Sequence, residues 1–190
     1  MVESCTLSND RKNYTLVLRD GIHVHDGQPL TADDVEASMN RWLAVSTQGK
    51  ANLPGVQFSK VDDKTVTFRL PSPSLITLNV LADVKNIPAV MPKRIIDEAN
   101  SSKKPVTELI GTGPYKLAEF KPGDYLHLTR DNKYQSRMEP ASGLSGEKKA
   151  DVKEIWFRYI TDESTRLAGA ITGEYDLVFQ LPKDNIDTLS

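Results

Sequence analysis

Alternating apolar and polar positions mark the strands in the first half of the chain. Residues 13–19 (NYTLVLR) alternate in this way and are rich in β-branched and aromatic side chains, which predicts a strand. Residues 56–61 and 65–70 predict two more strands, joined across residues 62–64 as a hairpin. After Thr31, apolar residues return every three to four positions, which predicts a helix with one apolar face.

Polar residues at the start of this helix fit a helix N-terminus. Thr31 can cap free backbone N–H groups, and Asp33 and Asp34 lie at the positive end of the helix dipole. Trp42, on the apolar face, is expected in the core. The rest of the first hundred residues is expected to form a loop (49–55), two short helices (75–81 and 92–99) and a polar linker (100–104).

In the second half, a hairpin precedes a strand–helix–strand unit. Asp162 can cap the helix of that unit, and Gly173 is suited to end it because glycine accepts a left-handed conformation. This order of elements implies parallel pairing of the two flanking strands. Trp156 is expected in the core, and His127 is expected to be paired or half-buried. The expected elements are strands over 115–121, 125–130, 154–160 and 175–179, an exposed loop over 137–150, and helices over 162–172 and from Lys183 onward.

Composition narrows the class of function. The chain has 190 residues, of which 38% are hydrophobic and 26% charged, with a net charge of -2. This is an ordinary globular balance, and the lack of a basic patch argues against a nucleic-acid partner. Cys5 is the only cysteine, so an intramolecular disulfide is excluded and the thiol is interpreted as structural. No cofactor is expected.

One cluster of residues could carry chemistry. His23 and His25 stand two apart, which places both on one side of a strand, and Asp26 could supply a third metal ligand. A metal-dependent hydrolase is therefore one hypothesis, and a polar strand end beside a turn is the alternative. Asp33 and Asp34 do not suit an acid–base pair, because neighbours on a helix diverge by about 100°.

Four groups of residues resemble the signatures of one family. The first combines YTLVLRDGI at 14–22 with HDGQPLTADDV at 25–35. The second is GTGPY at 111–115, with Leu128, Arg130 and Tyr134 after it, and the third runs from Glu154-Ile155 through TRL at 165–167 to GEYDL at 173–177. The fourth is VES at 2–4, where Cys5 replaces the tryptophan usual in the family. The chain thus resembles the extracellular solute-binding proteins that serve peptide, oligopeptide and nickel ABC importers.

The resemblance implies a mixed α/β (α+β) fold of the periplasmic-binding-protein-like type II, present in part. The resemblance implies that members of the family have three lobes and are more than about twice as long as this chain. By analogy, residues 1–105 are expected to form the accessory lobe, and residues 106–190 part of the first ligand-binding lobe. The chain is therefore expected to be a fragment of a longer protein.

The resemblance also implies a function without catalysis. The protein would capture oligopeptides or dipeptides in the periplasm, or elsewhere outside the cytoplasm, and deliver them to ABC permease subunits in the membrane. Phe179 and Gln180 are expected to approach the ligand cleft, because the C-terminal ends of strands commonly line ligand crevices. A nickel- or haem-binding member and a receptor that docks on a sensor remain alternatives. Unpaired sheet edges also predict self-association of the chain.

Overall fold

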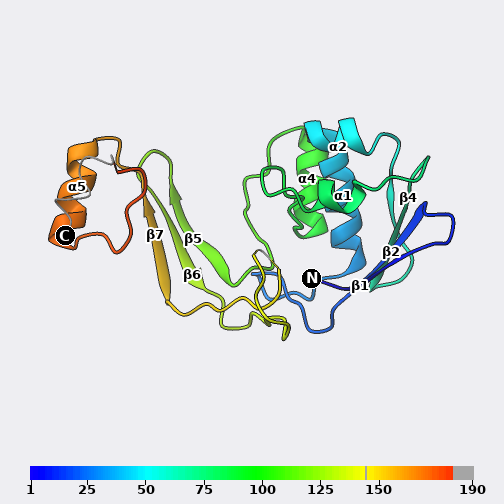
Figure 1. Cartoon of the computed structure of the whole chain (residues 1–190), viewed down its shortest axis with the longest axis horizontal. Helices are drawn as coiled ribbons and strands as arrows, with labels where there is room; N and C mark the ends of the chain where they lie inside the picture. Colours follow the sequence, from blue (N-terminus) through cyan, green and yellow to red (C-terminus); the bar gives the residue numbers. More distant parts are fainter. Residues whose placement is uncertain (144, 182–190) are drawn as a thin grey trace. The chain divides into compact units, whose positions relative to one another are not determined.

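The chain forms two compact units. The computed structural model describes residues 1–143 and 145–181. Unit 1 comprises Met1–Lys116 and Arg130–Lys153, and unit 2 comprises Leu117–Thr129 and the described residues from Glu154 onward (Figure 1). This division differs from the lobes expected at residues 1–105 and 106–190, which stay a prediction.

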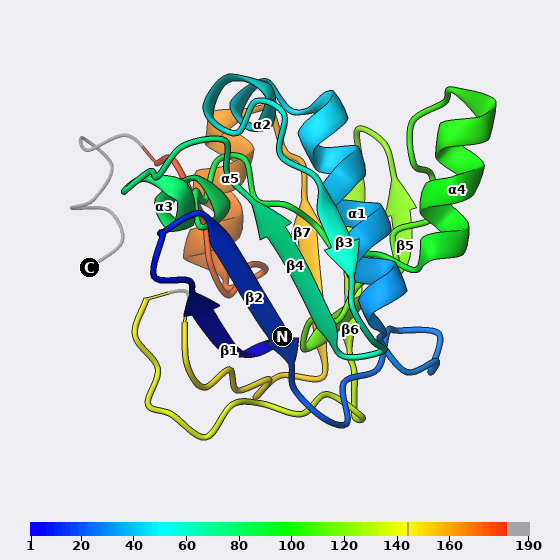
Figure 2. The same cartoon turned by 90° about the vertical axis from the view of Figure 1, so that its right-hand side faces the viewer.

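A four-stranded antiparallel sheet forms one layer of unit 1. Its strand order is β1-β2-β4-β3, and Figure 2 shows these strands side by side. The strands predicted over 13–19, 56–61 and 65–70 are confirmed, with the second and third paired as a hairpin. The bounds are β1 Val2–Leu7, β2 Asn13–Leu18, β3 Phe58–Lys60 and β4 Thr65–Arg69.

Helices cover one face of this sheet. Helix α1 (Ala32–Val45) packs on β3 and β4, and α4 (Lys93–Ser102) packs on α1. Two short helices, α2 (Thr47–Asn52) and α3 (Thr77–Leu81), complete the layer. The loop expected over 49–55 is partly wrong, because α2 occupies its start. The Ser46 side chain accepts a hydrogen bond from the Gly49 N–H at 3.2 Å and so caps that short helix.

The end of α4 also differs from expectation. Residues 100–102 belong to the helix rather than to the polar linker expected over 100–104. The helix ends at Lys103, which has a φ of 55° in the left-handed region. Polar side chains on an exposed helix face leave no hydrophobic signal for this last turn.

The core of unit 1 is built around a row of aromatic rings. Phe68 on β4 pairs in register with Tyr14 on one neighbouring strand and with Phe58 on the other. Its ring lies 4.8 Å from that of Tyr14 and 4.6 Å from that of Phe58. Trp42 of α1 is buried against this cluster, as predicted, and its indole N–H donates to the Asn86 carbonyl at 3.0 Å. Cross-strand aromatic pairs of this kind fix the register of the sheet.

A three-stranded sheet and one helix make up the second part of the fold. The strand order is β5-β6-β7, and β6 and β7 run antiparallel. Asp162 accepts a hydrogen bond from the Thr165 N–H at 2.7 Å, and Gly173 ends the helix at a φ of 72°, both as predicted. The bounds are β5 Tyr115–Lys121, β6 Tyr125–Arg130, β7 Glu154–Arg158 and α5 Glu163–Thr172.

The predicted parallel strand–helix–strand unit is wrong in its last strand. Within the described residues, no strand follows α5, and residues 175–179 run without regular structure. The N–H groups of Glu174 and Tyr175 bond to the Gly169 carbonyl at 2.9 and 3.3 Å. The Tyr175 ring lies so close to Gly169 that a Cβ there would come within 2.1 Å of it. The segment is therefore tied to the helix end, whereas a strand needs a neighbouring ladder.

Trp156 is not a core residue, contrary to expectation. Its side chain is 44% exposed on β7, where it stacks on His127 at a centroid distance of 3.8 Å and packs on Tyr125 at 5.0 Å. The interpretation of His127 as half-buried is confirmed. The helix expected from Lys183 onward lies outside the described residues, and no helix among those described is long and apolar enough to cross a membrane.

Truncating one ring of the aromatic row should destabilise unit 1. Phe58 has no exposed surface. We expect Phe58→Ala to lower the free energy of unfolding by ~3–5 kcal/mol, because it leaves a cavity among packed rings. Urea denaturation followed by circular dichroism measures this. Phe120→Ala is the control, since that side chain is 56% exposed. A control loss as large as the Phe58→Ala loss would contradict the assignment of the core.

Candidate functional site

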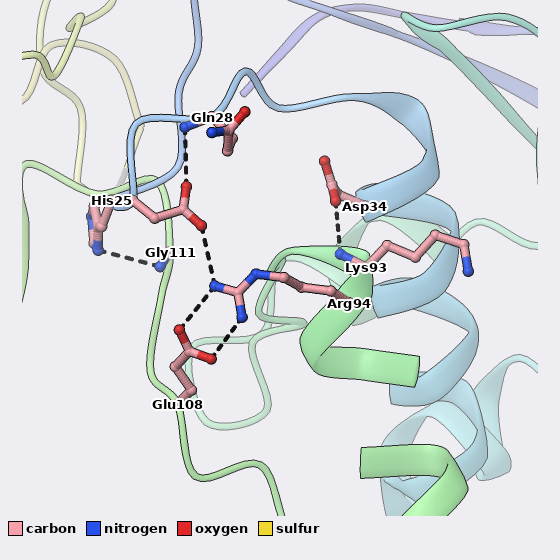
Figure 3. A network of polar contacts seen from close by, with 8 residues as sticks. His25, Gln28, Asp34, Lys93, Arg94, Glu108 and Gly111 are labelled. Carbon is pink, nitrogen blue, oxygen red and sulfur yellow. Dashed lines mark hydrogen bonds and ion pairs between the residues drawn. The ribbon is translucent and has the colours of Figure 1, made fainter. Parts of the chain in front are cut away.

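A histidine joins two distant segments of unit 1. The backbone N–H of His25 donates to the Gly111 carbonyl at 2.9 Å, and the Gly111 N–H donates to His25 Nδ1 at 3.2 Å (Figure 3). The other ring nitrogen, Nε2, lies 3.1 Å from the Gly113 carbonyl oxygen. Because Nδ1 accepts a hydrogen bond, the ring is neutral and its proton is on Nε2, which donates to Gly113. Both nitrogens are thus used to hold a turn.

The three residues considered as metal ligands do not converge. His23 Nδ1 lies 2.8 Å from the Gly21 carbonyl oxygen, and Asp26 accepts from the Gln28 N–H at 3.0 Å. The nitrogens of His25 are already occupied as described. Among the residues that the structure describes, no group of three or more potential ligands could hold a metal ion. The cluster therefore forms a structural contact between residues 25–28 and residues 108–113, which we call the crossing. The geometry of a metal-dependent hydrolase is not assembled there.

An arginine from α4 reinforces the same crossing. Arg94 binds Glu108 through two nitrogen–oxygen contacts of 2.8 Å and contacts Asp26 at 3.2 Å (Figure 3). The hydrogen bonds from Arg94 lower the pKa of Glu108. The pKa of Asp26 is lowered as well, first by the Gln28 N–H and then by Arg94. Sequence reasoning missed Arg94 and Glu108, because neither belongs to a motif with recognisable spacing.

Both carboxylates after Thr31 lie in the first turn of α1, as predicted. Asp34 accepts from the Thr31 N–H at 2.9 Å and from the Lys93 N–H at 2.7 Å, so one carboxylate serves the first turns of both α1 and α4 (Figure 3). Asp33 instead pairs with Lys60 at 2.6 Å. The two carboxylates have separate partners and do not share a substrate position.

The residues expected at the ligand cleft lie in unit 2. Phe179 is 66% exposed, and Gln180 adopts a φ of 59°, in the left-handed region. The Gln180 carbonyl accepts from the Arg166 guanidinium at 3.4 Å, and the same guanidinium donates to the Ile160 and Thr161 carbonyls at 2.8 and 2.9 Å. One arginine thus connects the two ends of the α5 region. Since residues 175–179 are not a strand, the role of Phe179 and Gln180 stays a prediction.

The fold and these contacts define a mixed α/β scaffold whose polar side chains hold its own turns. Residues 1–190 match the family of bacterial extracellular solute-binding proteins, family 5 Middle. The chain belongs to this family. Its members bind solutes outside the cytoplasm and are not enzymes, which confirms the resemblance inferred from the sequence motifs.

Two curated relatives are longer than this chain. A probable peptide ABC transporter periplasmic-binding protein, y4tO of Sinorhizobium fredii, is 34% identical over 97% of this chain and 35% of its own length. The probable D,D-dipeptide-binding periplasmic protein DdpA of Escherichia coli is 28% identical over the whole chain and 35% of its own length. The chain therefore spans about a third of the length of these relatives.

Solved structures agree with the fold. AgaA from A. tumefaciens R10, in complex with agropinic acid, superimposes with a TM-score of 0.78 at 25% identity, covering 98% of this chain and 36% of that one. A dipeptide-binding protein from Pseudoalteromonas sp. SM9913 gives a TM-score of 0.78 at 18% identity, covering 99% and 39%. The mixed α/β fold is therefore that of family 5 periplasmic binding proteins over part of their length.

Removing the arginine of the crossing should change the acid stability of the chain. The lowered pKa of Glu108 means that its contribution to stability is present above its unfolded pKa of about 4.5 and is lost as the pH falls through the folded pKa. We expect Arg94→Gln to cost stability at pH 7 and to differ less from the unaltered chain at pH 3. Urea denaturation at both pH values measures this. Arg11→Gln, at an exposed site outside the crossing, is the control. A constant difference across that pH range would contradict the expectation.

Proposed function

We propose that this chain supplies part of the substrate-binding component of an ABC importer that captures oligopeptides or dipeptides outside the cytoplasm. The observation that carries the proposal is the family match over residues 1–190, together with the relatives named as peptide- and dipeptide-binding. The solved relatives with bound peptides include DppA from Helicobacter pylori in complex with the peptide STSA, which shares the fold. Peptide ligands and ABC permease subunits are the partners that this function requires.

Capture of a peptide by such a protein needs shape change and hydrogen bonding, not bond breaking. Lobes that close around a ligand by a hinge motion bury it from water, and the closed form is the one that a permease can recognise. The hydrogen bonds that join His25 to Gly111 and Arg94 to Asp26 support this proposal, because a moving lobe must hold its own turns together while the hinge bends. Binding of this kind can accept varied side chains where bridging waters fill the pockets.

One solved protein with this fold holds a metal complex. NikZ from Campylobacter jejuni, solved in complex with Ni(L-His), superimposes with a TM-score of 0.68 at 22% identity, and HbpA2 from Haemophilus parasuis superimposes with a TM-score of 0.74 at 25% identity. Within the described residues, no set of metal ligands favours nickel. Peptide is therefore the function we propose, and a nickel- or haem-binding member is an outcome that the binding experiment distinguishes.

Phe179 and Gln180 are the residues that we propose for ligand contact. Phe179 offers an exposed aromatic surface, and the left-handed conformation of Gln180 turns the backbone directly after it. A glutamine amide has two donors and one acceptor, which suit a peptide main chain. The Arg166 contacts limit how far this segment can move from the start of α5.

Peptide binding tests both the function and these residues. The chain, expressed within a protein of its relatives' length, should bind dipeptides or oligopeptides in a calorimetric titration against a panel that includes Ni²⁺ and haem. We expect Phe179→Ala to weaken peptide binding by about tenfold, the order of a single interface residue worth more than 1 kcal/mol. Leu177→Ala is the matched control, because Leu177 is also apolar and 71% exposed.

The outcomes of the titration test the peptide function and the role of Phe179 separately. Binding of nickel or haem but of no peptide would overturn the peptide function. Peptide binding that is equally strong with Phe179→Ala and Leu177→Ala would leave the function standing and would remove Phe179 from the site.

Self-association is a further expectation for the 190-residue chain. The sheet β5-β6-β7 has unpaired outer edges within the described residues, and Phe157 and Trp156 of β7 are 49% and 44% exposed. Unpaired edges and exposed apolar side chains favour pairing with a second copy. We expect the average mass measured by light scattering to rise with protein concentration. A constant monomer mass up to millimolar concentration would contradict this.

A further inference from the structure

A small cavity in unit 1 is not used by the proposed peptide function. Its volume is about 220 Å³, and its walls, all within unit 1, come from Met1, Arg19, Ile22, His23, residues 112–114, residues 133–135 and Lys148. The cavity therefore lies beside the turn that His25 holds, and not at the segment proposed for peptide contact.

The walls of this cavity carry positive charge without acidic residues. Arg19, Lys133 and Lys148 all line it, as does His23, whereas no aspartate or glutamate does. None of the three permanent cations forms an ion pair among the described residues. The larger groove between α1 and α4 is different, because Asp33, Glu36 and Asp97 line it together with Lys93 and Arg41.

The arginine of the cavity is held in place without a carboxylate. Its guanidinium donates to the backbone carbonyls of Gln135 and Ser136 at 3.1 and 3.3 Å. Its Nε is buried and has no hydrogen-bond partner. Carbonyl dipoles fix the orientation of a guanidinium but do not cancel its charge, so the positive potential persists in the cavity. Thr112 and Tyr134 add neutral hydroxyl donors to the walls.

We propose that this cavity binds a small tetrahedral oxyanion of the phosphate or sulfate class. Three cations and the His23 imidazole suit such an ion, whose oxygens accept several charge-assisted hydrogen bonds at once. The volume equals that of several water molecules of ~30 Å³ each, and it is below the roughly 300–1,000 Å³ of pockets that take larger ligands. A bound oxyanion would link Arg19 and His23 to residues 133–135 and Lys148, and would so stabilise unit 1.

Titration of the 190-residue chain with inorganic phosphate and, separately, with sulfate tests the proposal. Both titrations are made at constant ionic strength, with chloride as the balancing anion. Isothermal titration calorimetry should show saturable binding of one oxyanion per chain, and amide shifts in NMR spectra should concentrate at Thr112, Gly113 and Gln135. We expect Lys133→Gln combined with Lys148→Gln to weaken binding by roughly tenfold, the order for loss of two partly exposed charge contacts.

Matched variants keep this test decisive. Lys50→Gln removes one cation at an exposed position of α2, away from the cavity walls, and should leave the affinity unchanged. Circular dichroism confirms that each variant is folded, and the single variant Lys148→Gln replaces the double variant if that one does not fold. Absence of saturable binding, or equal weakening by Lys50→Gln, would overturn the proposal. Failure here leaves the peptide function untouched, because the two tests use different ligands and residues.

Discussion

The contact between residues 25–28 and residues 108–113 is the constraint on which unit 1 depends. The two segments are some 86 residues apart at the His25–Gly111 hydrogen bond, so closing the loop between them costs chain entropy before any contact is gained. A neutral imidazole and a bidentate Arg94 contact offset that cost together. Because these bonds use backbone carbonyls and carboxylates in fixed directions, they also set the path of the chain into β5.

Features that depend on neighbouring residues could be predicted from the sequence. The hairpin strands over 115–121 and 125–130 match β5 and β6, because alternation and a Pro-Gly-Asp turn are local signals. The helix N-termini at Thr31 and Asp162 are local in the same sense. The family resemblance could also be recognised from the sequence, because its motifs keep their order along the chain.

Features that depend on packing could not be predicted in this way. The burial of Trp156 depends on which element covers its face of the sheet, and alternation along β7 does not contain that information. The fate of residues 175–179 depends on Gly169, whose missing side chain admits the Tyr175 ring. The second hydrogen bond of Asp34, to the Lys93 N–H, joins two helices 59 residues apart and leaves no trace in either helix's own pattern.

The contrasting surroundings of the two tryptophans give each unit its own optical signal. Trp42 in unit 1 is 8% exposed and bonded to a backbone carbonyl, which is the environment of a short-wavelength indole emission. Trp156 in unit 2 is 44% exposed and lies flat against the His127 ring at a centroid distance of 3.8 Å, so its indole meets water, which is the environment of a longer-wavelength emission. Since the chain contains only these two tryptophans, the emission spectrum of the unlabelled protein separates into one component for each unit.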